Sequence, residues 1–319
     1  MGKQDFPHSD RDAATPAKGL LERASDIFDF GGALKGQGLP PLAVPPELIP
    51  PPPLFTAPVA QTATPGVAPK PRAADWAGPV QALDREVLGE NGFIVPGAPI
   101  TGLAEEFRII KRELQAGLRQ DGEAHEDGRV VLVASAHPGD GKTFCAVNLA
   151  LSLAAESNIE VLLVDGDVAK PDAPRLLGLN ADMGLLDVLA DPALRVEDYV
   201  IRTDVPGLSV LSAGTGTTRD GEFLASAQMD AIIKALISGR PERIVIIDSA
   251  PLLAASAASI LAAHVDLTLL VVRADRTSET ALRDAAELLN GCKNVQLLLN
   301  GVKFSASGRR FGTYYGREG

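Results

Sequence analysis

The pattern of apolar and polar residues changes near residue 100, and the part after it alternates short apolar runs with amphipathic stretches. The apolar runs are nearly continuous in Val, Ile and Leu, which is typical of strands that are covered on both faces. They lie at 129–135, 160–167, 208–214, 243–249, 266–272 and 295–300. Between them, the spacing predicts helices at 142–156, 183–190, 222–238, 253–264 and 277–290. This alternation predicts an α/β fold with a doubly wound, mostly parallel sheet.

The region before the first predicted strand divides into three parts. Residues 1–34 contain an amphipathic segment that is either a short docking helix or a helix without a partner. Residues 35–95 hold most of the 17 prolines found before residue 100, so we expect a disordered linker there. A helix with one apolar stripe is predicted over 103–120, and it opens a domain at 96–308. Residues 309–319 would form a flexible tail.

Composition narrows the class of protein. The chain has 319 residues and a formal net charge of -11, which argues against a protein that works by neutralising a nucleic-acid backbone. Two cysteines, Cys145 and Cys292, are too few to cross-link a secreted scaffold. No apolar run approaches the ~20 residues of a membrane-spanning helix, and the first residues lack the apolar core of a signal peptide. We therefore expect a soluble cytoplasmic protein that binds no nucleic acid.

The strongest local signal is the segment AHPGDGKT, which follows a predicted strand and opens a predicted helix. That is the context of a phosphate-binding loop. Gly139 and Gly141 allow backbone amides to turn towards phosphate oxygens, and Lys142 supplies a positive charge. The hydroxyl of Thr143 can ligate Mg²⁺, and the helix N-terminus adds its dipole. A glycine turn that only caps the helix is the alternative interpretation.

Two other predicted strands end in acids. Asp165 and Asp167 follow the run VLLV, and Asp248 follows IVII. The carboxyl ends of strands in an open parallel sheet face the ligand crevice, beside the phosphate-binding loop. A carboxylate there needs a cation or a hydrogen-bond donor, and Mg²⁺ on a nucleotide answers that need. Asp248 alone is also consistent with capping of the next turn, but three converging acids favour the nucleotide site.

These segments resemble a known family. AHPGDGKT, LLVDGDVAKP and VIIDSAP resemble the three Walker motifs of the bacterial tyrosine kinases, which are P-loop proteins related to the cell-division and plasmid-partition ATPases. Glu105, Arg108 and Lys111 in EEFRIIKR match the motif through which members of that family assemble into rings. The tail FGTYYGREG is similar to the family's C-terminal tyrosine cluster, with Tyr314 and Tyr315 as the implied phosphorylation sites.

The resemblance implies ATP and Mg²⁺ as cofactors and gives each matching residue a role. Lys142 and Thr143 would hold the phosphates and Mg²⁺, with Asp165 and Asp248 completing the metal site. Asp167 would accept the proton of the attacking tyrosine, and the catalytic set would include Lys142 and all three acids. The implied nucleotide-binding residues are Pro138, Gly139, Asp140, Gly141, Lys142, Thr143, Phe144, Arg273 and Asn300. The last two would lie near the adenine and the ribose.

The chain departs from the family's pattern at several positions. Ala136 stands where the loop usually begins with glycine, and His137 replaces the signature lysine of the partition ATPases. Ala169, followed by Lys170, replaces an arginine of the middle motif. Lys111 stands where arginine is usual, which removes bidentate pairing with a carboxylate.

Taken together, the resemblance implies an ATP-dependent protein-tyrosine autokinase that phosphorylates its C-terminal tyrosines in trans, within a ring formed through residues 105–111. It would regulate exopolysaccharide polymerisation or export. A transmembrane polysaccharide co-polymerase would activate it in trans and hold it at the inner face of the membrane. The alternatives are a partition- or positioning-type P-loop ATPase and a nucleotide-binding regulatory adaptor without kinase activity. The tail tyrosines, the EEFRIIKR helix and His137 favour the kinase.

Overall fold

A computed structural model describes residues 75–120, 129–292 and 294–302 of the chain. These residues form an eight-stranded sheet. The strands are β1 (Val80–Gln81), β2 (Val130–Ser135), β3 (Glu160–Gly166), β4 (Ile201–Thr203), β5 (Leu208–Leu211), β6 (Arg243–Ser249), β7 (Leu267–Arg273) and β8 (Val295–Asn300). Their spatial order is β1-β4-β5-β3-β6-β2-β7-β8, and every pair is parallel except β4 with β5. The predicted α/β, doubly wound, mostly parallel fold is confirmed.

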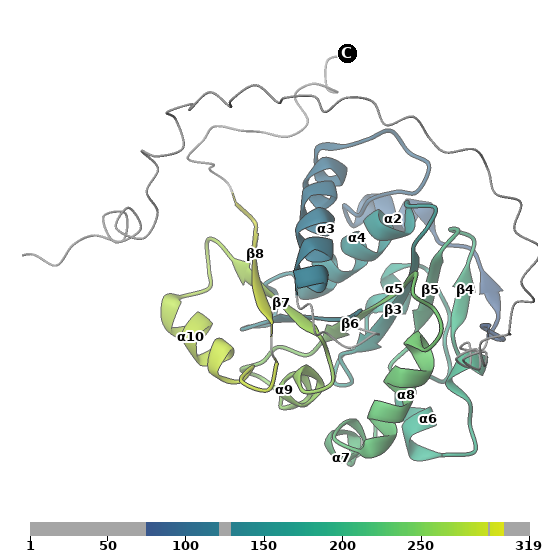
Figure 1. Cartoon of the computed structure of the whole chain (residues 1–319). Coiled ribbons are helices and arrows are strands. Elements are labelled where there is room, and N and C mark those ends of the chain that lie inside the picture. Colours follow the sequence, from purple (N-terminus) through teal and green to yellow (C-terminus); the bar gives the residue numbers. More distant parts are fainter. Residues whose placement is uncertain (1–74, 121–128, 293, 303–319) are drawn as a thin grey trace, which may run out of the picture. The chain divides into compact units, whose positions relative to one another are not determined.

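Helices lie on both faces of this sheet (Figure 1). One face carries α2 (Arg85–Glu90), α3 (Gly102–Gln120), α4 (Lys142–Ala154) and α5 (Ala173–Leu176). The other face carries α6 (Leu185–Ala190), α7 (Asp220–Leu224), α8 (Ala227–Ile237), α9 (Ala257–Ala262) and α10 (Glu279–Glu287). A short 3₁₀ turn, η2 (Val196–Asp198), precedes β4.

Each central strand contributes to two apolar layers. In β2, Val130, Leu132 and Ala134 pack into the layer under α8 and α9, whereas Val131 and Val133 pack into the layer under α3 and α4. Since successive side chains of a strand point to opposite faces, a strand buried on both faces must be apolar throughout. That is why these strands could be predicted from continuous apolar runs.

The element boundaries agree with the sequence pattern, apart from short elements and one break. The helix predicted over 222–238 is two helices, α7 and α8, separated at Ser226, whose backbone is extended (φ -82°, ψ 156°). Three further elements were not predicted, and each is only three or four residues long: α5, η2 and β4. Elements of that length carry too few residues to display a period.

The expected linker over 35–95 is wrong for its last part. Residues 75–95 contain strand β1 and helix α2, and the domain therefore begins before residue 96. The Asp84 carboxylate caps α2 by accepting from the amides of Glu86 (3.0 Å) and Val87 (3.1 Å). Leu88 is fully buried, and the Phe93 ring stacks within the apolar layer under α4. The sequence pattern did not predict these elements, because their buried side chains are few and irregularly spaced.

The start of the described chain is fastened to the sheet by an aromatic contact. The Arg243 guanidinium lies over the Trp76 ring at 3.9 Å from the ring centre. Arg243 is itself buried at the start of β6 and pairs with Glu160 at 2.9 Å. The amide of Ala77 donates to the Glu197 carbonyl (2.9 Å). Such a stacked and paired arginine gives the chain a fixed entry point to the fold.

If residues 75–95 belong to the folded domain, shortening a buried side chain there should lower the domain's stability. Leu88→Ala should lower the free energy of unfolding by about 2–5 kcal/mol, because it leaves a cavity in a fully packed layer. Val80→Ala, at a side chain that is 61% exposed in the same segment, should change it by less than about 0.5 kcal/mol. Urea denaturation of both variants measures the difference. Equal stabilities would mean that residues 75–95 are a linker after all.

Candidate active site

The strand order brings the predicted acids to one edge of the sheet. β6 lies between β2 and β3, so the end of β2 and the acids of the other two strands are neighbours. Asp165 is the registered partner of Asp248 across β3 and β6, and Val133 is the partner of Asp248 across β2 and β6. The phosphate-binding loop continues directly from β2 into α4. The convergence expected from the sequence is therefore confirmed.

Glycine geometry shapes the loop between β2 and α4. Gly139 has φ +81° and Gly141 has φ +100°, a region that side chains with a Cβ rarely adopt. Asp140 is fully buried, and its Oδ2 accepts from the His137 amide at 2.9 Å. The Ser135 hydroxyl donates to the His137 carbonyl at 3.0 Å. The loop is thus closed by its own polar groups, and the Asp140 side chain acts as an internal brace.

Lys142 interacts with all three acids of the site. Lys142 Nζ lies 2.8 Å from Asp167 Oδ2. Burial opposes the ammonium charge, but the carboxylates of Asp248, Asp167 and Asp165 outweigh it, and the pKa of Lys142 is raised. Asp165 accepts from the amides of Ala173 (3.0 Å) and Asp167 (3.2 Å). One ammonium ion therefore faces three carboxyl groups.

Two of these carboxyl groups resist ionisation. Burial raises the pKa of Asp165 to about 6, although two backbone amides oppose the shift. Burial raises the pKa of Asp248 to about 7, against the attraction of Lys142 and a hydrogen bond from Thr143. Asp248 Oδ1 is buried, and no hydrogen-bond partner for it exists among the described residues. A buried carboxylate oxygen without a donor is the kind of group that a cation would satisfy.

These residues fit Mg²⁺. The metal prefers oxygen ligands and usually takes one or two carboxylates together with substrate phosphates. Thr143, Asp165 and Asp248 supply oxygens of that type, and the unpartnered oxygen of Asp248 is the structural sign in favour. The side chains of Pro138 and Phe144 offer no such ligand. The Asp140 carboxylate holds the loop through Oδ2, and its Oδ1 is also buried without a partner among the described residues. Phe144 stacks on Phe93 with 5.4 Å between the ring centres, so any nucleotide contact would come from its backbone.

Arg273 and Asn300 end neighbouring strands, but only Asn300 contacts the loop. They are registered partners at the ends of β7 and β8. Asn300 Nδ2 donates to the Asp140 carbonyl at 2.8 Å, and the Arg273 side chain pairs with Asp275 at 3.1 Å. A third residue, Arg276, donates from Nη2 to the Pro138 carbonyl at 3.3 Å. Sequence reasoning missed Arg276, because no motif marks a residue that lies 138 positions from its partner.

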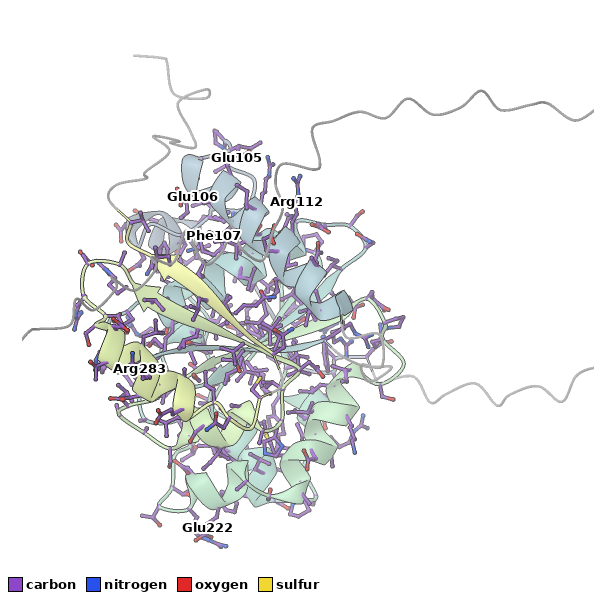
Figure 2. The ribbon with its side chains drawn as sticks, turned by 60° about the vertical axis from the view of Figure 1, so that its left-hand side comes forward. Glu105, Glu106, Phe107, Arg112, Glu222 and Arg283 are labelled. Carbon is purple, nitrogen blue, oxygen red and sulfur yellow. The ribbon has the colours of Figure 1, made fainter. Side chains whose placement is uncertain are left out.

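The helix with the ring motif lies elsewhere on the domain. Glu105 and Arg108 form an ion pair within α3, and their side chains are 26% and 43% exposed. Lys111 turns inward, donating to the Ser152 carbonyl (3.0 Å) and pairing with Glu156 (2.8 Å) beyond the end of α4. Figure 2 shows Glu105, Glu106 and Arg112 on this helix. The three matching residues thus do not share one environment.

The structure describes only one of the chain's three tyrosines. Tyr314 and Tyr315 lie outside the described residues. The third tyrosine of the chain, Tyr199, packs against the apolar layer under α8 and α9. None of the helices in the described ranges is long and apolar enough to cross a membrane.

Comparison with protein families gives a match over most of the domain. The model of the ParA family, described as NUBPL iron-transfer P-loop NTPase, matches residues 127–302. The matched range begins just before β2 and includes the phosphate-binding loop and all three acids. It therefore covers the whole of the site built above.

Two curated relatives are tyrosine kinases. The tyrosine-protein kinase YwqD of Bacillus subtilis is 30% identical over 217 residues, which is 67% of this chain and 87% of YwqD. The tyrosine-protein kinase Wzc of Salmonella typhimurium is 28% identical over 233 residues, which is 72% of this chain and 31% of Wzc. The chain thus spans less than a third of the length of Wzc.

Among solved structures, the BceF tyrosine kinase domain superposes with a TM-score of 0.52 and 26% sequence identity. The superposition covers 72% of this chain and 93% of the BceF domain. The family match, the relatives and the convergent loop and acids agree with one another. The chain belongs to the ParA family of P-loop NTPases and to the bacterial tyrosine kinases.

Proposed function

We propose that the protein is an ATP-dependent tyrosine autokinase. The observation that carries the proposal is the unpartnered, buried oxygen of Asp248, a carboxyl group that interacts electrostatically with Lys142 and Asp165. Phosphoryl transfer depends on positioning and charge neutralisation more than on covalent help from the protein. This site supplies both, through the Lys142 ammonium ion, the backbone amides of the loop and the Asp248 carboxylate that can bind a metal ion.

The Lys142–Asp167 pair suggests how the site responds to ATP. The triphosphate brings negative charge to the loop, so Lys142 would turn from Asp167 to the phosphates. Asp167 would then be free to accept a proton. As a tyrosine oxygen bonds to the γ-phosphorus, the bond to the departing ADP oxygen breaks and the phenolic proton passes to the Asp167 carboxylate. Thr143, Asp165 and Asp248 would hold Mg²⁺, which neutralises the developing charge on the phosphates.

The acceptors would be Tyr314 and Tyr315 of a neighbouring subunit. We propose that subunits contact one another through Glu105 and Arg108, whose side chains are partly exposed. Lys111 is engaged within its own subunit, so we assign it the task of joining α3 to α4 rather than an intersubunit contact. Two phosphates on adjacent tyrosines would add about -3 to -4 charges to the tail and weaken the assembly by repulsion.

Such a cycle fits regulation of exopolysaccharide polymerisation or export. The protein would lie in the cytoplasm, at the inner face of the membrane, through a transmembrane co-polymerase that activates it in trans. The ParA family match keeps a second candidate open, a positioning-type ATPase that uses the same loop and acids to activate water. An adaptor that binds nucleotide only to fix its shape would use the loop without the chemistry.

Phosphate transfer to the tail is the direct test. After incubation with ATP and Mg²⁺, mass spectrometry should find phosphate on Tyr314 and Tyr315 but not on Tyr199. Asp167→Asn should slow this transfer by about 10²–10⁴-fold, because it removes the proton acceptor. ATP hydrolysis that continues in the Tyr314→Phe/Tyr315→Phe variant, without phosphotyrosine in the parent, would instead identify a positioning ATPase.

The Asp248 carboxyl group links stability, pH and metal binding. Its pKa is raised from 3.8 to about 7, so its stabilising contribution is complete below about pH 4 and is lost as pH rises towards 7. Asp248→Asn should therefore stabilise the nucleotide-free protein at pH 8 by at least about 1 kcal/mol.

The same variant should bind Mg²⁺·ATP at least about tenfold more weakly, because the neutral amide offers the metal no charge. Asp284→Asn, at an exposed position on α10, is the control for both measurements. In the parent, Mg²⁺·ATP affinity should rise between pH 6 and pH 8. A flat pH profile, or a destabilised Asp248→Asn protein, would contradict this account.

The oligomer contact has its own test on helix α3. Glu105→Ala/Arg108→Ala should shift the protein from oligomer to monomer in analytical ultracentrifugation, with the melting temperature nearly unchanged. Arg112→Ala, an exposed neighbour on the same helix, should do neither (Figure 2). Lys111→Ala should lower the melting temperature, because it breaks the tie to Ser152 and Glu156. Oligomers that survive the double substitution would rule out this surface.

A further inference from the structure

Two carbonyl groups of the phosphate-binding loop are held from outside the loop. Arg276 Nη2 donates to the Pro138 carbonyl at 3.3 Å, and Asn300 Nδ2 donates to the Asp140 carbonyl at 2.8 Å. Both donors come from the far side of the sheet edge, beyond β7, and neither belongs to a Walker motif. They grip alternate residues, one on each side of Gly139.

The direction of these hydrogen bonds fixes the direction of two amides. In a planar trans peptide, the carbonyl and the N–H of the same unit point in opposite directions. A donor on the Pro138 carbonyl therefore turns the Gly139 N–H away from Arg276. A donor on the Asp140 carbonyl likewise turns the Gly141 N–H away from Asn300. Amides turned inward in this way are the groups that cradle phosphates in such loops.

The glycines make room for both donors. A Cβ on Gly139 would lie 3.0 Å from Arg276 Nη1, and a Cβ on Gly141 would overlap Asn300 Nδ2. Both glycines also have positive φ. The close approach of the two side chains is thus built into the loop sequence, which argues that the contacts belong to the folded loop.

The two donors are fastened to each other. The Ala274 amide donates to the Asn300 carbonyl at 2.9 Å, which joins the turn after β7 to the end of β8. Within that turn, the Arg276 amide donates to the Arg273 carbonyl (3.1 Å), and the Arg273 amide donates to the Thr277 hydroxyl (3.0 Å). Arg276 and Asn300 therefore belong to one hydrogen-bonded unit and are not two independent surface contacts.

We propose that Arg276 and Asn300 are positioning residues of the nucleotide site, which hold the Gly139 and Gly141 amides towards the β-phosphate. Arg276 also adds a positive charge next to an anionic ligand. This inference rests on the proposed function, since it presumes that the loop binds a nucleotide. It gives Asn300 a task different from the contact with adenine and ribose that the family resemblance implies.

Nucleotides that differ in phosphate number distinguish these tasks. Displacement of a fluorescent mant-ADP probe from the full chain gives the affinities for ATP, ADP and AMP. Arg276→Ala and Asn300→Ala should each weaken the binding of ADP and ATP about tenfold. That is the effect expected when one hydrogen bond that orients a phosphate-binding amide is lost. AMP, which has no β-phosphate, should change less than about threefold. Asn300→Asp should cost the most, because its carboxylate faces the Asp140 carbonyl.

Two controls keep the result interpretable. Arg283→Ala removes an exposed arginine of α10 that pairs with Glu279, and it should leave all three affinities unchanged (Figure 2). Arg276 is exposed, so its variants should melt as the parent does, and they decide the question if the Asn300 variants unfold. Arg276→Lys should recover only part of the loss, since charge alone does not orient a carbonyl.

Several results would overturn the inference. Equal weakening of AMP, ADP and ATP by Asn300→Ala would mean that Asn300 contacts the nucleoside. Unchanged affinities in both alanine variants, with a parent that binds mant-ADP, would refute the positioning role and leave the proposed function intact. A parent that binds no nucleotide at all would refute both.

Discussion

The site depends on one electrostatic constraint: three carboxyl groups end neighbouring strands, and a single ammonium ion lies among them. The sheet cannot relax this crowding, because Asp165 and Asp248 are fixed by strand register. Without ligand, two features reduce the repulsion between the carboxyl groups. Lys142 pairs with Asp167, and the raised pKa values of about 6 and 7 keep the two buried acids partly protonated near neutral pH. A magnesium nucleotide would replace both: the metal ion would bind the acids, and the phosphates would pair with Lys142.

This constraint explains why the sequence was so informative about the site and less so about its surroundings. An acid that follows four apolar strand residues has few explanations, and a glycine-rich turn between strand and helix has one dominant use. Asp165, Asp248 and Lys142 could therefore be placed together from the sequence. The roles of Arg276 and Asn300 could not, since each depends on which carbonyl lies opposite it across the sheet edge.

The errors at the start of the domain have a different cause. Trp76 is held by a cation–π contact and Leu88 by its buried position under α4, and neither belongs to a repeating pattern. Sequence periodicity reports only long, regular elements. Lys111 illustrates the same limit, because a motif match identifies the residue type but not the side of the helix it uses. Its ammonium joins α3 to the end of α4.

Helix α4 connects the nucleotide site to the proposed assembly surface on α3. It begins at Lys142 and spans 13 residues, about 20 Å, before it reaches the region tied to Lys111. At the other end of the domain's sequence, Asn300 ends β8 in contact with Asp140, and the described residues stop at Val302. The 12 residues that follow Val302, up to and including Tyr314, extend at most about 40 Å, enough to reach any nearby pocket. Reach alone therefore does not select the acceptor; assembly through α3 would do so by raising the effective concentration of a neighbour's tail at each site.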